Sequence, residues 1–120
     1  MIGCGAMGAA TCSHLARRGI SVIGIERFTR GHSFGSSTGY TRIYRQAYPE
    51  SPEYVELVKE AGRQFKEMEK DMSVDLFYDA DFAYIGTPEG NLVNGSKIAA
   101  DKHNLPYTMY DRKSFAAKYP

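Results

Sequence analysis

The glycine pattern at residues 3–8, Gly-Cys-Gly-Ala-Met-Gly, constrains the fold of this chain more than any other feature. A helix rich in small residues is predicted over Ala6–Arg18, and Gly19 is expected to end it, because glycine is favoured just beyond a helix C-terminus. The β-branched residues of Ser21–Glu26 then predict a buried parallel strand. A G-x-G-x-x-G loop, a helix and a strand in this order are typical of a dinucleotide-binding βαβ unit.

The defining positions of this unit have physical roles. Gly3 allows the tight turn out of a strand, Gly5 lets the backbone approach a pyrophosphate, and Gly8 lets the helix pack closely on the sheet. The free N–H groups at the helix start, with the positive end of the helix dipole, bind phosphate. Glu26 lies 18 residues after Gly8, at the end of the second strand, where a carboxylate can accept hydrogen bonds from ribose hydroxyls.

The strand before the glycine loop is unusually short. A first strand of this fold needs about five apolar residues, and only Met1 and Ile2 precede Gly3. The sequence also stops at Pro120 without a closing element. We therefore expect a fragment of a longer protein, truncated at both ends.

The composition limits the classes of partner. Hydrophobic residues make up 42% and charged residues 24% of the 120 residues, which is ordinary for a globular protein. A net charge of +1 gives no argument for nucleic acid, and no apolar run reaches the roughly 18 residues that a membrane helix needs. Cys4 and Cys12 form no C-x-x-C pair, so we expect two small buried residues, no metal site and a reducing compartment. The scattered His14, His32 and His103 are expected to be solvated.

After residue 47 the βαβ rhythm is lost. Helices are predicted over Ser51–Asp71, with Ser51 as its N-cap, over Pro88–Asn104 and over Asp111–Lys118, with Asp111 as its cap. The Asn94-Gly95 pair weakens the first half of the second of these, which is also compatible with a loop. Short strands are predicted at 76–78 and 82–86, as a hairpin, and at 107–110. The expected fold class is α/β: a Rossmann-like segment over 1–47, leading into the first part of an α+β second domain over 48–120.

Between these two parts lie a polar loop and a segment with two arginines. The loop covers residues 27–39, on the carboxyl side of a strand, where α/β folds bind ligands. Arg42 and Arg45 follow in the sequence YTRIYRQAY. On the residues alone, two solvated arginines on an amphipathic strand are favoured over a binding role, and the net charge is too small to favour nucleic-acid binding.

Residues 35–48, GSSTGYTRIYRQAY, resemble the pattern G-S-[SH]-H-G-x-[ST]-R-I-I-R-x-A-Y of the glycine and D-amino-acid oxidase superfamily of FAD-dependent oxidoreductases. Within it, the chain is most similar to the branch of sarcosine, N-methyltryptophan and pipecolate oxidases, and the resemblance covers nearly the whole chain. It implies an FAD cofactor and a small amino-acid substrate with a carboxylate. Nucleic-acid and membrane partners are not expected, the oligomeric state is open, and a cytoplasmic or peroxisomal location is expected.

The resemblance also implies roles for single residues. Arg42 would lie beside the flavin ring, and Arg45 would pair with the substrate carboxylate, a bidentate contact that suits a guanidinium. Glu26 would hold the adenosine ribose. The remaining cofactor contacts would come from the glycine loop and from the two segments after the second strand: Gly3, Gly5, Ala6, Met7, Gly8, Arg27, Ser36, Ser37, Thr38 and Thr41.

The chain departs from the family pattern at Thr38, where histidine is usual, so the substrate and the pH behaviour are open. The family's lysine for oxygen activation and its flavin-tethering cysteine would lie beyond Pro120, and neither Cys4 nor Cys12 matches that cysteine. The substrate expected from the family is a secondary or N-methyl amino acid, oxidised to an imine with oxygen as acceptor. Whether the protein is an oxidase or a dehydrogenase is not decided by these residues.

Two alternatives compete with this hypothesis. NAD(P)-dependent 3-hydroxyacid dehydrogenases also begin with G-x-G-x-M-G, and Arg27 after Glu26 could meet a 2′-phosphate. The segment after residue 35 argues against them, because it does not continue into another βαβ unit. The second alternative is an inactive fragment of the flavoenzyme that aggregates or binds FAD poorly.

Overall fold

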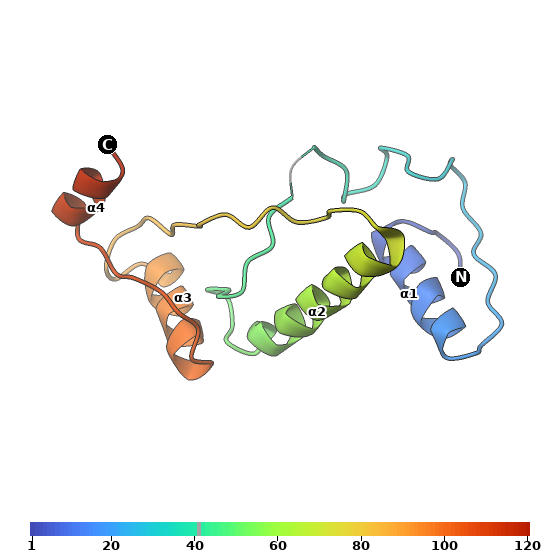
Figure 1. The fold of residues 1–120 in the computed structure, drawn as a ribbon, viewed down its shortest axis with the longest axis horizontal. Coiled ribbons are helices and arrows are strands. Elements are labelled where there is room, and N and C mark those ends of the chain that lie inside the picture. The colour runs from blue at the N-terminus through green and yellow to red at the C-terminus, as the bar shows by residue number, and fades with distance from the viewer. Residues whose placement is uncertain (41) are drawn as a thin grey trace. The chain divides into compact units, whose positions relative to one another are not determined.

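The computed structural model describes residues 1–40 and 42–120 and contains four α-helices in that part of the chain (Figure 1). They are α1 (Ala6–Arg17), α2 (Tyr54–Met72), α3 (Asn91–Lys102) and α4 (Arg112–Lys118). The described residues form two compact units, Met1–Ile43 and Tyr44–Pro120. The predicted division into segments 1–47 and 48–120 stays a prediction. No helix of the described part is both long and apolar enough to cross a bilayer.

The first unit contains a minimal βαβ arrangement. Ile2 and Ile25 form a parallel bridge, in which the Gly3 amide donates to the Ile25 carbonyl at 2.8 Å and the Ile25 amide donates to the Met1 carbonyl at 2.9 Å. Helix α1 connects the two paired segments, as expected for a crossover between parallel strands. The predicted strand over 21–26 is therefore reduced to one bridged position, because only Met1 and Ile2 stand opposite it.

Helix α1 begins and ends as its sequence predicts. Gly5 is its N-cap. At the other end, the Gly19 amide donates to the Ala16 carbonyl at 2.9 Å, and Gly19 has φ of +74°. Because this left-handed conformation is unfavourable for residues with a Cβ, glycine stops the helix here.

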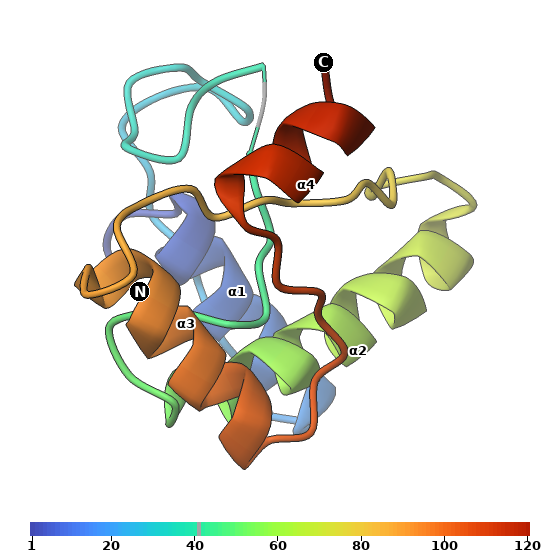
Figure 2. The ribbon, with the colours of Figure 1, turned by 90° about the vertical axis from the view of Figure 1, so that its left-hand side faces the viewer.

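The core of the second unit lies where the start of α2 meets α3 (Figure 2). Val55 of α2 and Ala99 of α3 are completely buried, and Ala100 is 3% exposed. Two polar contacts join the same helix faces: Lys102 pairs with Glu53, and His103 Nδ1 lies 2.9 Å from Glu56 Oε1. The start of α2 and the end of α3 thus meet at a small core that contains Val55, Ala99 and Ala100.

The helix boundaries correct the predictions in detail. Helix α2 has Glu53 as its N-cap, not Ser51, because Pro52 and Glu53 form a separate turn in which Ser51 Oγ accepts from the Glu53 amide at 3.2 Å. Asn94 and Gly95 lie inside α3 and do not interrupt it. Helix α4 is confirmed together with its cap, since Asp111 Oδ1 accepts from the Ser114 amide at 2.7 Å.

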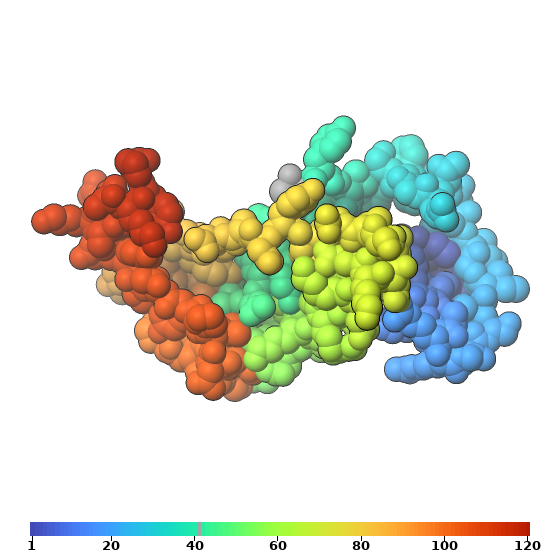
Figure 3. Space-filling model, in the orientation of Figure 1, coloured from blue at the N-terminus to red at the C-terminus, as the bar shows by residue number. Residues whose placement is uncertain are grey.

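The strands predicted after residue 74 are absent from the described residues: 76–78, 82–86 and 107–110 have no strand pairing. The α/β class is accordingly not confirmed, since the regular structure of residues 1–40 and 42–120 is helical apart from one bridge. In the space-filling view of Figure 3, the segment that follows α2, coloured gold, lies at the molecular surface. A strand needs a neighbouring strand for its backbone groups; instead, the Leu76 and Phe77 amides donate to Glu69 Oε1 at 2.7 and 2.9 Å.

Candidate functional site

The glycine loop forms an open cradle at the start of α1. Gly3 has φ of +85° and turns the chain out of the bridged segment. A Cβ at Gly8 would overlap the Gly3 carbonyl oxygen, whereas a Cβ at Gly5 would meet nothing within 4 Å. The space over Gly5 is therefore free for a ligand, whereas the space over Gly8 is occupied by the Gly3 carbonyl group.

The first turn of α1 has free capacity for an anion. No side chain of residues 1–40 or 42–120 caps its N-terminus, and its first turn contains no acidic residue. The first amides of a helix have no acceptor within the helix, so they are available to phosphate oxygens. Ala6 and Met7, the two predicted contacts at this point, are both exposed, Met7 to 84%.

Glu26 lies beside this cradle and connects it to the loop that follows. Its Oε2 accepts from the Cys4 amide at 2.7 Å, and its Oε1 accepts from the Arg27 and Phe28 amides at 2.7 and 3.1 Å. These bonds, led by the Cys4 amide, lower the pKa of Glu26, so the carboxylate is charged at neutral pH. Since a carboxylate oxygen can accept two hydrogen bonds, Oε2 retains capacity for a ribose hydroxyl.

Histidine 32 is a neighbour of Glu26 that the sequence did not reveal. His32 Nε2 lies 3.9 Å from Glu26 Oε1, and the His32 ring packs at 4.9 Å from Phe28 and 5.9 Å from Phe34. The expectation that His32 is solvated is thus wrong. It is also wrong for His103, whose Nε2 is buried and has no hydrogen-bond partner among the described residues. Both contacts come from chain folding, and no short-range spacing in the sequence signals them. His14 is exposed, as expected.

Arg42 organises the serine-rich loop of the first unit. Its Nε donates to the Ser37 carbonyl and its Nη2 to the Ser36 carbonyl, both at 3.0 Å, and Nη2 also donates to the Thr38 carbonyl. All four residues are exposed. The structure thus brings Arg42 together with Ser36, Ser37 and Thr38, whereas Thr41, also predicted to touch the cofactor, lies outside the described residues. The guanidinium of Arg27 instead stacks on Phe28, 5.3 Å from its ring centre.

Arg45 belongs to the second unit and has different surroundings. Its guanidinium carbon lies 4.7 Å from the Tyr48 ring centre, 5.8 Å from Tyr84 and 5.9 Å from Phe82. The side chain is half-buried, and in the part of the chain that the structure describes it has neither an ion pair nor a hydrogen bond. A half-buried cation without an anion is a candidate receptor for a carboxylate.

A hollow borders the Tyr48 ring on which Arg45 stacks. It has a volume of about 450 Å³ and is lined by Tyr48, Glu50, Tyr54 and Val58. The Tyr48 ring therefore contacts the Arg45 guanidinium and also lines the hollow. The sequence had indicated Arg45 by its resemblance, but not this hollow.

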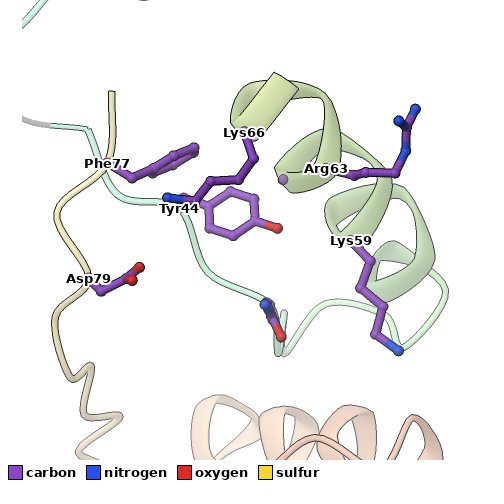
Figure 4. A pocket seen from close by; sticks show the side chains of 8 residues that line it. Tyr44, Lys59, Arg63, Lys66, Phe77 and Asp79 are labelled. Carbon is purple, nitrogen blue, oxygen red and sulfur yellow. The ribbon is translucent and has the colours of Figure 1, made fainter. Parts of the chain in front are cut away.

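A second pocket in this unit has three basic side chains but little capacity for an anion (Figure 4). It has a volume of about 280 Å³ and lies around Tyr44, whose hydroxyl donates to the Val58 carbonyl at 2.6 Å. Each cation on its rim already has a carboxylate: Lys59 has Glu56 at 3.4 Å, Arg63 has Glu60 at 2.6 Å, and Lys66 has Glu69 at 3.0 Å. The pocket is thus bordered by a solvated face of α2 on one side and by the rings of Tyr44 and Phe77 on the other.

Similar proteins are known for the whole length of the chain. The family described as FAD dependent oxidoreductase (DAO) matches residues 1–120. The chain is 36% identical to the monomeric sarcosine oxidase of Streptomyces avermitilis and 37% identical to the peroxisomal sarcosine oxidase of Mus musculus, in both cases over 100% of this chain. It is 27% identical, again over 100% of its length, to the N-methyl-L-tryptophan oxidase of Yersinia pestis.

These relatives are much longer than the chain. It spans 31% of the Streptomyces protein, 30% of the mouse protein and 32% of the Yersinia protein. The family uses FAD, which confirms the predicted cofactor and removes the nicotinamide alternative. The open space at Gly5, the uncapped helix start and the spare acceptor on Glu26 fit the diphosphate and ribose of that cofactor.

Proposed function

The chain belongs to the family of FAD dependent oxidoreductases, and from this premise we propose that the protein oxidises a secondary or N-methyl amino acid, such as sarcosine, to an imine, with oxygen as electron acceptor. The relatives named as sarcosine and N-methyl-L-tryptophan oxidases support this substrate class. When bound, FAD supplies the two-electron acceptor for this oxidation.

The residues of the first unit would bind and orient the cofactor. We place the diphosphate on the free amides at the start of α1, over Gly5, and a ribose hydroxyl on Glu26 Oε2. Arg42 would lie at the flavin ring, held by the loop carbonyls of Ser36 and Ser37. A guanidinium fixed in this way would place positive charge where negative charge develops on the ring, which is the preorganised arrangement that favours a transition state.

One observation carries the substrate proposal: Arg45 is half-buried, stacked on aromatic rings and without an anion among the described residues. A substrate carboxylate would supply that anion through two parallel N–H···O bonds. Binding of the carboxylate at Arg45 would orient the amine-bearing carbon, since the two groups are separated by one carbon in an amino acid. Arg45 would therefore affect substrate binding more than the chemical step.

The test replaces Arg45 and follows oxidation of N-methyl amino acids by the purified full-length protein. Charge-assisted hydrogen bonds contribute about 1.5–3 kcal/mol each, so we expect Arg45→Met to raise KM on the order of 100-fold. The control is Arg112→Met, which removes an exposed arginine of the same unit. An Arg45→Met protein that carries flavin and oxidises sarcosine-like substrates with an unchanged KM would contradict the proposal.

A further inference from the structure

The aromatic surroundings of Arg45 come from two separate segments of the chain. Tyr48 lies three residues after Arg45, whereas Phe82 and Tyr84 belong to the extended segment that follows α2. Phe82 and Tyr84 also pack on each other, with ring centres 5.0 Å apart at an angle of 75°. We call Tyr48, Phe82 and Tyr84 the aromatic cage of Arg45.

Tyr84 is the member of the aromatic cage that makes two different contacts. Its ring lies 5.8 Å from the guanidinium carbon of Arg45, and its hydroxyl donates to the Ala47 carbonyl at 2.7 Å in a part-buried hydrogen bond. Ala47 is separated from Tyr84 by 37 residues. One side chain therefore fixes both the backbone next to Arg45 and the guanidinium itself.

Stacking on the guanidinium has a consequence for the ligand. Aromatic rings attract the flat faces of a guanidinium, while its five N–H donors point outward in the plane. A stacked arginine also loses less side-chain freedom when it binds, because its plane is already held. Because the rings hold the guanidinium carbon at 4.7–5.9 Å from their centres, the outward N–H donors of Arg45 remain available to a carboxylate, which can engage them with two bonds.

We propose that Tyr84 is a positioning residue for Arg45, acting through its ring on the guanidinium and through its hydroxyl on the Ala47 carbonyl. The inference rests on the proposed function for the carboxylate ligand, whereas the contacts of Tyr84 with Arg45 and Ala47 belong to the fold. Tyr84 does not touch the reacting atoms. It acts by holding the guanidinium in one plane and its backbone in one place.

The experiment uses three substitutions in the purified full-length protein. Tyr84→Leu removes the ring and the hydroxyl, Tyr84→Phe removes the hydroxyl alone, and Tyr78→Leu is the matched control. Tyr78 lies in the same segment, is 90% exposed and has no ring contact or hydrogen bond in the described part of the chain. Flavin content and thermal unfolding establish that each variant folds.

Two readouts separate positioning from a general structural role. The first is the dissociation constant of acetate, measured by calorimetry, and the second is KM against kcat for an N-methyl amino acid. We expect Tyr84→Leu to weaken acetate binding and raise KM about ten-fold with kcat within about two-fold, and Tyr84→Phe to have an effect of about three-fold. Tyr78→Leu should leave both constants unchanged.

A double-mutant cycle with Arg45→Lys completes the test. Because an ammonium group has no plane to orient, Tyr84→Leu should change acetate binding less than two-fold when lysine occupies position 45. An equal loss in both backgrounds, or a Tyr84→Leu protein that behaves as Tyr78→Leu does, would overturn the proposal. Cage-dependent acetate binding in a protein that oxidises no amine would uphold the cage and reject the proposed function.

Discussion

Gly5 and Gly8 lie three residues apart at the start of α1, yet their missing side chains have different consequences. Gly8 faces the Gly3 carbonyl, so a Cβ there would push two backbone segments apart. Gly5 faces open space and has φ of −64° and ψ of −170°, which alanine adopts without strain. We therefore expect Gly5 to be required for binding of the ligand, whereas Gly8 is required by the fold.

Alanine at each position should separate these two roles. We expect Gly5→Ala to change the free energy of unfolding of the apoprotein by less than about 0.5 kcal/mol, but to weaken FAD binding at least about ten-fold, since its methyl group occupies the phosphate space. Gly8→Ala should cost about 1–3 kcal/mol by overpacking and weaken FAD binding as well. Thermal unfolding and quenching of FAD fluorescence measure the two effects. Unchanged FAD affinity in Gly5→Ala would contradict the placement of the diphosphate.

Single residues also show where the sequence was informative. The glycine loop and Glu26 were predicted as parts of one site, and the Cys4 amide does donate to Glu26, because a βαβ unit brings its two strand ends together. The neighbour His32 was missed, since a turn over residues 29–32, closed by the His32 amide on the Thr29 carbonyl, brings it back to Glu26. Cys4 and Cys12, expected to be buried, are half-buried free thiols beside Gly24, where a Cβ would meet their sulfur atoms at 2.6 and 3.5 Å.

At the scale of elements, helices were predicted better than strands for a physical reason. The hydrogen bonds of a helix lie within one segment, so its apolar spacing and caps are local signals, as with Asp111 and α4. A strand needs a partner from elsewhere in the chain. The segment 76–86 has the alternation of a strand, but its contacts are Glu69 on one side and the Arg45 region on the other.

Helix α3 shows how packing overrides a local signal. Asn94-Gly95 suggested a loop, yet both residues are helical, because Gly95 lies against the backbone of Pro49 where a Cβ would overlap the Pro49 carbonyl oxygen. Gly95 thus lowers the helix propensity of α3, but it also lets α3 lie closer to Pro49 than a residue with a Cβ would allow. This explains why a residue typical of breaks occurs within a helix.

A substitution of Gly95 tests whether helix propensity or packing against Pro49 has the larger effect on stability. Gly95→Ala gains about 1 kcal/mol of helix propensity but incurs an overpacking cost of about 1–3 kcal/mol against a backbone that cannot rotate away. The two effects sum to a net loss of stability of about 0–2 kcal/mol, which urea unfolding measures. Asn94→Ala, at an exposed position of the same helix, should be neutral or slightly stabilising. Stabilisation by Gly95→Ala equal to that by Asn94→Ala would show that the contact with Pro49 is not formed.

For the whole molecule, the exposed apolar side chains are the feature that matters most. In the first unit, Ile2, Ile23 and Ile25 are 88%, 76% and 61% exposed, although they flank the bridge expected at the centre of a sheet. In the second unit, Leu57 and Ile85 are 68% and 70% exposed. A stable monomer rarely exposes so many large apolar groups on paired segments. In the 120 residues alone, the apolar side chains beside the Ile2–Ile25 bridge are therefore left uncovered, although an exposed strand edge of this kind needs a covering element.

The isolated 120-residue chain should consequently associate and bind FAD weakly. Unpaired backbone on both sides of the Ile2–Ile25 bridge can pair with other copies, and a loop on a loosely held strand presents its amides to phosphate less rigidly. We expect light scattering that rises with concentration, strong binding of a dye that reports exposed apolar surface, and FAD uptake well below one equivalent at micromolar protein. Ile23→Lys should reduce the scattering by adding charge at this edge, whereas Lys113→Ile, at an exposed position of α4, should not. A monomeric chain with one tightly bound FAD would contradict the prediction and show that the cradle at Gly5 and Glu26 is sufficient by itself.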